Sequence, residues 1–486
     1  MKKRWSSIFY ITVVIVFGTM IYWIVRNGKS LEKLKQFTPN KPVPPVTTQE
    51  NSFQLFTESF RSNLSNPLAV LLLQIIVIIA FARLFGYLFK KIGQPAVIGE
   101  IIAGIVLGPS LTALFFPGFS HFLFPVASLV NLHFLSQIGL ILFMFVIGME
   151  LEVSAIRKQA FGAVIVSHTS IIVPFALGMG LAYFLYNSFA PAGISFLSFA
   201  LFMGIAMSIT AFPVLARIIQ EKGFTKTKLG AIALTAAAVG DITAWFILAA
   251  VIAIVKAGTS ISILFSLGLA AVYIAIMFFL IRPLLLFKLG KIYTQQEKRR
   301  KVVIAGIFLI VLLSSYATEI IGIHALFGAF LVGVIMPSSL NFRSIVTDKI
   351  EDVSIVLLLP LFFAFNGLRT QIGLLNESHL WITFGWVILV AVAGKFGGSA
   401  ISAKMVGQSW KDSLSIGVLM NTRGLMELII LNIGYDLGIL SPQIFTMMVL
   451  MALVTTCMTG PALDLINWLM PDKPIATATT ETKTAP

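Results

Sequence analysis

The feature that most constrains this chain is a succession of long apolar stretches that begins near residue 67 and continues to residue 470. A helix rises about 1.5 Å per residue, so about 20 apolar residues cross the hydrocarbon core of a bilayer. Charged residues make up 11% of the chain, well below the roughly 25% of a soluble protein. The pattern predicts an all-α polytopic membrane protein.

Thirteen apolar stretches follow residue 66, and we expect each of them to be one helix of a membrane core at 67–470. The splits near 93 and 323 depend on Gly, Pro and polar residues rather than on a long loop. The stretches are about 67–89, 94–112, 134–150, 160–186, 196–220, 228–256, 260–289, 301–322, 323–338, 350–368, 379–404, 412–436 and 443–470.

The segments outside this core have a different composition. An apolar run at 8–25 follows the basic residues near the start, and no small-residue cleavage site follows it. We expect residues 1–26 to be an uncleaved anchor helix, with a signal peptide as the alternative. Residues 27–66 are polar and contain prolines, which is typical of an extended linker, and 471–486 is an expected cytoplasmic tail.

Lys and Arg residues collect in alternate loops, which is the orientation signal of a membrane protein. The stretches 217–228 and 282–301 are rich in them, whereas 113–132 and 187–195 contain none. This asymmetry places both termini in the cytoplasm, and we expect the membrane to be the bacterial inner membrane. The net charge of +15 therefore does not indicate a nucleic-acid partner.

One acid, Asp241, lies near the middle of the apolar stretch 231–250, AIALTAAAVGDITAWFILAA. An ionised carboxylate at that depth costs on the order of several kcal/mol unless a proton, a cation or a fixed positive charge compensates it. A carboxylate that takes either a proton or a metal cation, but not both, is the minimal part of an exchanger. The alternative is a structural acid held by neighbouring backbone or hydroxyl groups.

A polar break interrupts the stretch 196–220, where Ser208 and Thr210 precede Pro213. Proline removes an amide donor and clashes with the preceding turn of a helix. Broken helices are tolerated at membrane depth only where the freed groups are buried in protein or line a cavity. We expect Ser208 and Thr210 to border the ion site, although a simple proline kink is the alternative.

A second polar break, Asn421-Thr422-Arg423-Gly424 followed by Glu427, interrupts the stretch 412–436. Arg423 and Glu427 are spaced to pair along a helix, and a neutralised structural pair is one interpretation. Two discontinuous helices that cross at the midplane are typical of transporters built from inverted repeats. We therefore expect one repeat at 67–256, a connector helix at 260–289 and a second repeat at 301–470.

Lys395 lies well inside the stretch 379–404, among the glycines of GKFGGS. Such glycines favour close helix packing, so we expect Lys395 to point at the cavity near Asp241 and to stabilise it without a cation. Extension of the side chain to the membrane surface is the alternative. The single cysteine, Cys457, excludes an internal disulfide and a Cys-based metal site, and we expect no cofactor.

Four motifs then resemble one known family. SITAFPVLARII, AAAVGDITAW, HALFGAFLVGVIMP and NTRGLMELIILNIG are similar to those of the monovalent cation:proton antiporter superfamily, in the branch of the plant cation/H⁺ exchangers and Kef-type potassium/proton antiporters. The resemblance covers about 67–470. It implies a homodimer in membrane lipid that works by an elevator-like movement of its core domain against a dimerisation domain.

The resemblance also implies roles for individual residues. Asp241 matches the essential ion-binding aspartate, and Lys395 matches the basic residue of the core domain. Thr210 and Asn421–Glu427 match the crossing points of the two broken helices. The only metal expected at Asp241 is thus the transported cation.

Two departures from the family pattern modify this expectation. Electrogenic members have two adjacent acids and the nearest branch usually has Asn or Gln before the aspartate, but Gly240 stands here. We therefore predict electroneutral, one-for-one exchange, with Asp241 itself as the partner of Lys395. The sequence stops at Pro486, so we expect no nucleotide-binding regulatory domain within this chain.

The predicted function is secondary active exchange of Na⁺ or K⁺ for H⁺ by alternating access, with competition at one buried Asp. A passive K⁺ channel or efflux pathway on the same scaffold is the alternative. A sensor on an antiporter scaffold would be free to lose Asp241 and Lys395. No hydrolase motif or soluble catalytic domain favours an enzyme.

Overall fold

The computed structural model describes residues 12, 15–23, 26–27, 52–150, 160–224, 227–257, 260–286, 297–337, 350 and 353–471. The chain divides into two compact units, Met1–Ser65 and Asn66–Pro486. In the first unit, residues 15–23 of the predicted anchor are helical. The predicted extended linker contains a helix, α2 (Ser52–Leu64), because SFQLFTESF places its phenylalanines on one helical face.

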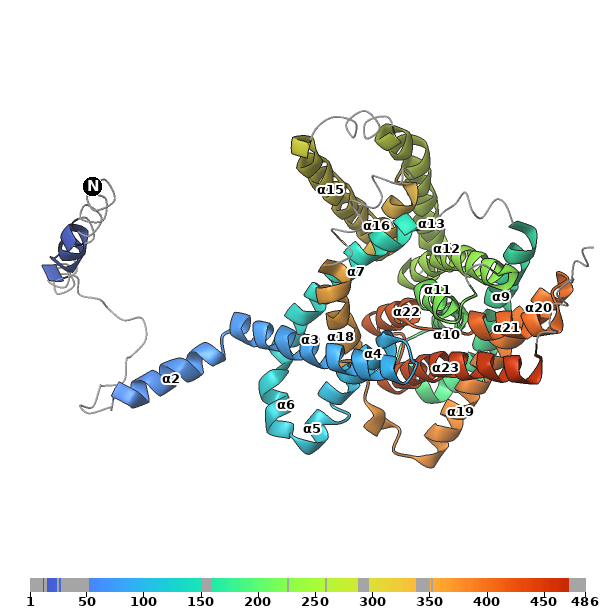
Figure 1. The fold of residues 1–486 in the computed structure, drawn as a ribbon, viewed down its shortest axis with the longest axis horizontal. Helices are drawn as coiled ribbons and strands as arrows, with labels where there is room; N and C mark the ends of the chain where they lie inside the picture. Colours follow the sequence, from blue (N-terminus) through green and yellow to red (C-terminus); the bar gives the residue numbers. More distant parts are fainter. Residues whose placement is uncertain are drawn as a thin grey trace, which may run out of the picture. The chain divides into compact units, whose positions relative to one another are not determined.

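The second unit is a bundle of helices, and no strand occurs in the described part of the chain (Figure 1). Its elements are α3 (Pro67–Lys91), α4 (Ala96–Leu107), α5 (Thr112–Phe115), α6 (Pro117–Leu123), α7 (Val126–Glu150), α9 (Ala160–Phe189), α10 (Phe196–Ser208), α11 (Phe212–Glu221), α12 (Lys228–Ala257), α13 (Ser260–Ala275), η1 (Ile276–Ile281), α15 (Glu297–Ile321), α16 (Ala325–Ile335), η2 (Ser354–Leu358), α18 (Leu359–Arg369), η3 (Ile372–Leu374), α19 (Ser378–Val392), η4 (Ala393–Gly397), α20 (Gly398–Met405), α21 (Trp410–Met420), α22 (Leu425–Asp436) and α23 (Pro442–Leu469).

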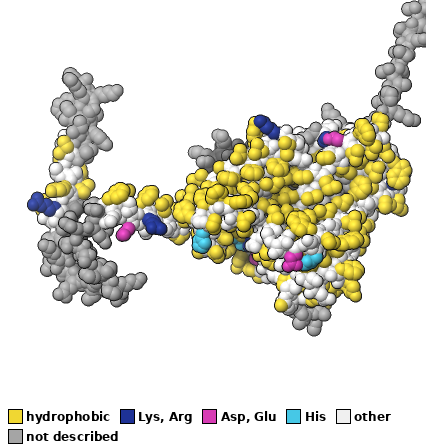
Figure 2. Space-filling view, turned by 90° about the horizontal axis from the view of Figure 1, so that it is seen from below, with side chains coloured by type: hydrophobic (Ala, Val, Ile, Leu, Met, Phe, Trp, Pro, Cys, Tyr) yellow, Lys and Arg dark blue, Asp and Glu magenta, His cyan; other side chains and the backbone are white. Residues whose placement is uncertain are grey.

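Within the described residues, ten helices are long and apolar enough to cross a membrane, or eleven if the bent pair α21 and α22 is one span. The helices α10 and α16 are apolar but shorter. The count of thirteen core helices and the inverted repeats stay predictions. Hydrophobic side chains dominate the face shown in Figure 2, as expected for a surface that meets lipid.

The predicted loop 113–132 is largely helical. It contains α5, α6 and the first turns of α7, which begins at Val126 rather than near residue 134. Pro117 stands in the first turn of α6 and Pro125 directly precedes α7. Proline is favoured at helix starts because its missing N–H would be unpaired there anyway.

The helices pack in two groups. One group contains α3, α4, α7, α16 and α18, and the other contains α9, α10, α12, α20 and α21. Within the first group, α7 and α16 meet through facing glycines. A Cβ atom at Gly333 would lie 2.2 Å from the carbonyl oxygen of Phe145 and 2.8 Å from the Cα of Gly148. Small residues of this kind let two backbones approach closely in a membrane protein.

Gly333→Ala is expected to destabilise the fold by about 1–3 kcal/mol, because the added methyl group overlaps a backbone carbonyl. The measurement is the thermal unfolding midpoint of the purified protein in detergent. Gly385→Ala is the matched control, since no atom lies within 4 Å of the added Cβ there. Equal midpoints for the two variants would contradict the close approach of α7 and α16.

Candidate functional site

Both predicted helix breaks are confirmed. The helix α10 ends at Ser208, α11 begins at Phe212, and Ile209 and Ala211 between them are extended. The helix α21 ends at Met420, and α22 begins at Leu425 with its axis bent by 41°.

The place of Pro213 rejects the alternative of a simple proline kink. This proline stands in the first turn of α11, where its missing amide leaves no carbonyl without a donor. It therefore starts the second half-helix and does not kink the first one. The break itself is the extended segment before it.

Hydrogen bonds join the two breaks to each other. The amide of Ala211 donates to the carbonyl of Thr422 at 3.0 Å, and the Thr210 hydroxyl donates to the carbonyl of Met420 at 3.1 Å. Helix ends leave backbone groups unpaired, and each break here satisfies groups freed by the other. The Thr210 proton is used in this contact, so only the lone pairs of its oxygen remain for a cation.

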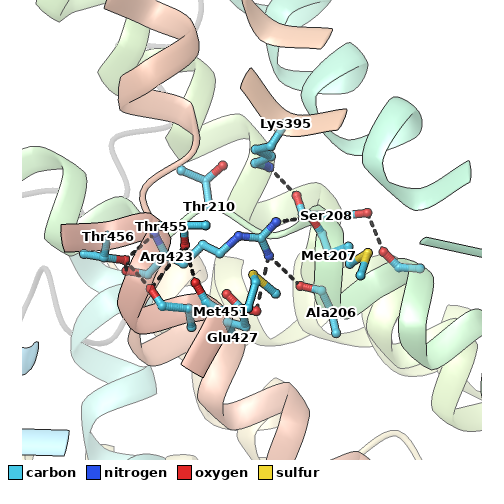
Figure 3. A network of polar contacts seen from close by, with 12 residues as sticks. Ala206, Met207, Ser208, Thr210, Lys395, Arg423, Glu427, Met451, Thr455 and Thr456 are labelled. Carbon is cyan, nitrogen blue, oxygen red and sulfur yellow. Dashed lines mark hydrogen bonds and ion pairs between the residues drawn. The ribbon is translucent and has the colours of Figure 1, made fainter. Parts of the chain in front are cut away.

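Two buried cations bind the last carbonyls of α10 (Figure 3). The Arg423 guanidinium donates to the carbonyls of Ala206 at 3.0 Å and Met207 at 2.8 Å. The Lys395 ammonium donates to the carbonyl of Ser208, whose own hydroxyl donates to Gly204. Positive groups at a helix C-terminus offset its partial negative charge.

Arg423 also forms an ion pair with Glu427 at 3.2 Å, and both side chains are fully buried. The hydroxyl of Thr456 on α23 accepts from the Arg423 amide at 3.0 Å and donates to the Arg423 carbonyl at 2.7 Å. This part of the second break is therefore a neutralised pair that is held firmly. Asn421 and Thr422 of the same break are also buried.

Lys395 lies in the π-helical turn η4 and is fully buried, so its side chain does not extend to the membrane surface. Besides Ser208, its ammonium donates to the carbonyl of Ser170 on α9 at 2.9 Å. Short π-helical turns within α-helices occur frequently at functional positions.

Asp241 on α12 is 1% exposed. Neither of its carboxylate oxygens has a hydrogen-bond partner among the described side chains and backbone groups. The positive groups that act on it are the Lys395 ammonium and the backbone N–H of Phe212 at the start of α11. These two positive groups act on the carboxylate, while its burial opposes an uncompensated charge.

The residues that sequence reasoning missed act mainly through their backbone. The carbonyls of Ala206, Met207 and Ser170 hold the two buried cations, and any residue type supplies a carbonyl. The signal that could have indicated Ser170 is Pro174, which lies four residues later inside α9.

Comparison with known proteins now identifies the family. Residues 76–467 match the family described as "Sodium/hydrogen exchanger, transmembrane". This chain belongs to that family. Its relatives place it in the monovalent cation:proton antiporter superfamily, as the four motifs predicted, and it is an integral membrane protein.

Three relatives of this chain show how similar it is to named antiporters. It is 44% identical to Na(+)/H(+) antiporter NhaS4 of Synechocystis sp. over 82% of this chain and 97% of the relative. It is 39% identical to Cation/H(+) antiporter 19 of Arabidopsis thaliana, over 87% of this chain and 52% of the relative. It is 33% identical to K(+)/H(+) antiporter 1 of Saccharomyces cerevisiae, over 84% of this chain and 47% of the relative. The chain thus spans about half the length of the latter two.

A solved structure shares the fold. The sodium proton antiporter MjNhaP1 from Methanocaldococcus jannaschii aligns with a TM-score of 0.58, over 83% of this chain and 97% of that one. The sequence identity is 14%, so the likeness concerns the arrangement of helices alone.

Arg423→Met is expected to destabilise the protein by about 3–5 kcal/mol, because it leaves the buried Glu427 carboxylate without its partner. The double variant Arg423→Met/Glu427→Met should recover part of this loss, since no unpaired charge then remains. Unfolding midpoints in detergent test both expectations. A double variant that unfolds at or below the midpoint of the single one would show that the ion pair is not the main source of the loss.

Proposed function

We propose that this protein exchanges Na⁺ or K⁺ for H⁺ across the membrane, and that Asp241 is the single carboxylate for which the two ions compete. The observation that carries the proposal is the Asp241 carboxylate, which is buried and has no hydrogen-bond partner among the described groups. Charge in such a place needs an external positive partner, because burial of an uncompensated ion is costly. The names of the relatives, Na(+)/H(+) and K(+)/H(+) antiporters, support the same ions.

The exchange follows from this competition. When the carboxylate is open to one side, it releases a proton and accepts the metal cation, with the Thr210 oxygen and the free backbone groups of the break as further ligands. The occupied and neutralised centre can then move to face the other side. A bare carboxylate crosses apolar surroundings with difficulty, and that penalty couples the two fluxes.

The position before the acid supports a stoichiometry of one proton for one cation. Gly240 supplies no second carboxylate, so one negative charge is neutralised on each crossing. The exchange is therefore electroneutral. Lys395 stabilises Asp241 while the cation leaves and the proton arrives.

The movement that this mechanism needs is an elevator-like shift between the two groups of helices. The group with α9, α10, α12, α20 and α21 carries the charged centre, and the group with α3, α4, α7, α16 and α18 would supply the dimer contact of a homodimer. Two inverted repeats, at 67–256 and 301–470, would account for the paired broken helices. Both termini would lie in the cytoplasm.

Asp241→Asn is expected to abolish exchange, because a neutral amide neither binds a proton nor balances a cation. The measurement is proton flux driven by a Na⁺ or K⁺ gradient in liposomes that contain the purified protein. Asp464→Asn is the matched control, since Asp464 is an exposed acid that pairs with Lys222 at 2.6 Å on the surface.

The same liposomes separate the competing functions. An Asp241→Asn protein that still exchanges ions would contradict the role of this carboxylate. Cation flux without proton movement would identify a passive channel instead. Exchange whose rate follows a clamped membrane voltage would contradict the electroneutral stoichiometry.

A further inference from the structure

The carbonyl of Ser170 is free to hold Lys395 because of a proline one turn later. In an α-helix the amide of residue i donates to the carbonyl of residue i−4. Pro174 lies inside α9 and has no amide proton, so the carbonyl of Ser170 lacks its usual donor. The Lys395 ammonium occupies this vacant acceptor at 2.9 Å.

The second acceptor of Lys395 is free for a different reason. The carbonyl of Ser208 ends the half-helix α10, where no following turn supplies a donor. Lysine has three N–H donors. Two are held by these carbonyls, which leaves the third free of both contacts, and Lys395 is the charged side chain that acts on Asp241.

Close packing keeps the proline against the lysine turn. A Cβ atom at Gly394, the residue before Lys395, would lie 2.9 Å from the Cα of Pro174. One turn further, a Cβ at Gly398 would lie 3.1 Å from the Cβ of Val173. The glycines at this four-residue spacing let η4 and α20 approach the backbone of α9 at the proline.

The chain uses the same arrangement elsewhere. Pro461 lies inside α23, and the carbonyl of Cys457, four residues earlier, accepts from the side-chain amide of Gln94 on α4 at 3.3 Å. A proline that frees a carbonyl for a side chain of another helix therefore recurs among the described helices. In the continuous helix η2–α18, the carbonyl of Val356, four residues before Pro360, likewise accepts from the Arg83 guanidinium of α3 at 3.0 Å.

We propose that Pro174 is a positioning residue for exchange: it keeps the Ser170 carbonyl available, so that Lys395 is held beside Asp241 without closing on it. This inference rests on the proposed function. An ammonium released from Ser170 would pair directly with the carboxylate, and the incoming Na⁺ or K⁺ would then have to displace it. The affinity of Asp241 on α12 for a cation therefore depends on the amide proton that Pro174 on α9 lacks.

The test compares variants that restore the amide. Pro174→Ala and Pro174→Gly both return an N–H that competes for the Ser170 carbonyl, and Pro461→Ala does the same at the control position. We expect the two Pro174 variants to raise the half-saturating concentration of Na⁺ or K⁺ about five- to tenfold, the factor of one net hydrogen bond, with little change in maximal rate. Pro461→Ala should leave it as in the unmodified protein.

Cation-dependent thermal stabilisation of the purified full chain gives the cation dissociation constant without transport, so an inactive variant is still informative. In a Lys395→Gln background, the Pro174 variants should no longer change the cation affinity, because Pro174 acts through Lys395. Pro174 variants that match Pro461→Ala, or that shift equally with and without Lys395, would overturn the proposal. If the Lys395→Gln protein shows no response to cations, the comparison of cation affinity between the two Pro174 variants and Pro461→Ala tests the proposal by itself.

Asp241→Asn measured alongside keeps the two proposals separate. Loss of exchange in that variant, together with unshifted Pro174 variants, rejects only the role of the proline. Retained exchange in Asp241→Asn rejects the proposed function itself, whatever the proline variants show.

Discussion

The constraint on which this structure depends is the cost of an unpaired charge or backbone group where no water reaches it. The end of α10 inside the bundle frees the carbonyls of Ala206, Met207 and Ser208. Two cationic side chains, rather than water, donate hydrogen bonds to them. Those cations, Arg423 and Lys395, would be equally costly alone. The freed carbonyls and the two cations therefore stabilise each other's burial, and the break, the arginine and the lysine form one interdependent unit.

Within that unit the two buried acids have different positions. Glu427 is paired with Arg423 at 3.2 Å, and the arginine is further fixed by backbone carbonyls and by Thr456. Asp241 has only the longer-range effect of Lys395 and the end of α11, and it forms no ion pair with any described residue. A carboxylate with a fixed cationic partner stabilises a fold, whereas one without an ion-pair partner can exchange a proton for a cation. This contrast separates the structural acid from the proposed ion carrier.

Much of this arrangement could be predicted from the sequence because it depends on residue types that are expensive in a membrane. An acid in a stretch of alanines, a lysine among glycines and two polar interruptions stand out against their apolar surroundings, and the buried centre contains all of them. What could not be predicted is which backbone carbonyls complete the centre, since a carbonyl carries no residue signature. Two roles stayed open for Pro213 at the level of sequence, because a proline in a helical pattern marks either a kink or a helix start, and only the backbone decides between them. The helices α5 and α6 were missed because they are too short for a periodic apolar pattern.

The most direct test of the account is the number of protons released when a cation binds. Purified protein in weakly buffered detergent solution is titrated with NaCl or KCl, with choline chloride as the control for ionic strength, while the pH change and the bound cation are measured together. Competition at one carboxylate predicts about one proton released for each cation bound, with a release that declines once the solution is alkaline enough to empty the site of protons. Cation binding that saturates without proton release at any pH would contradict it.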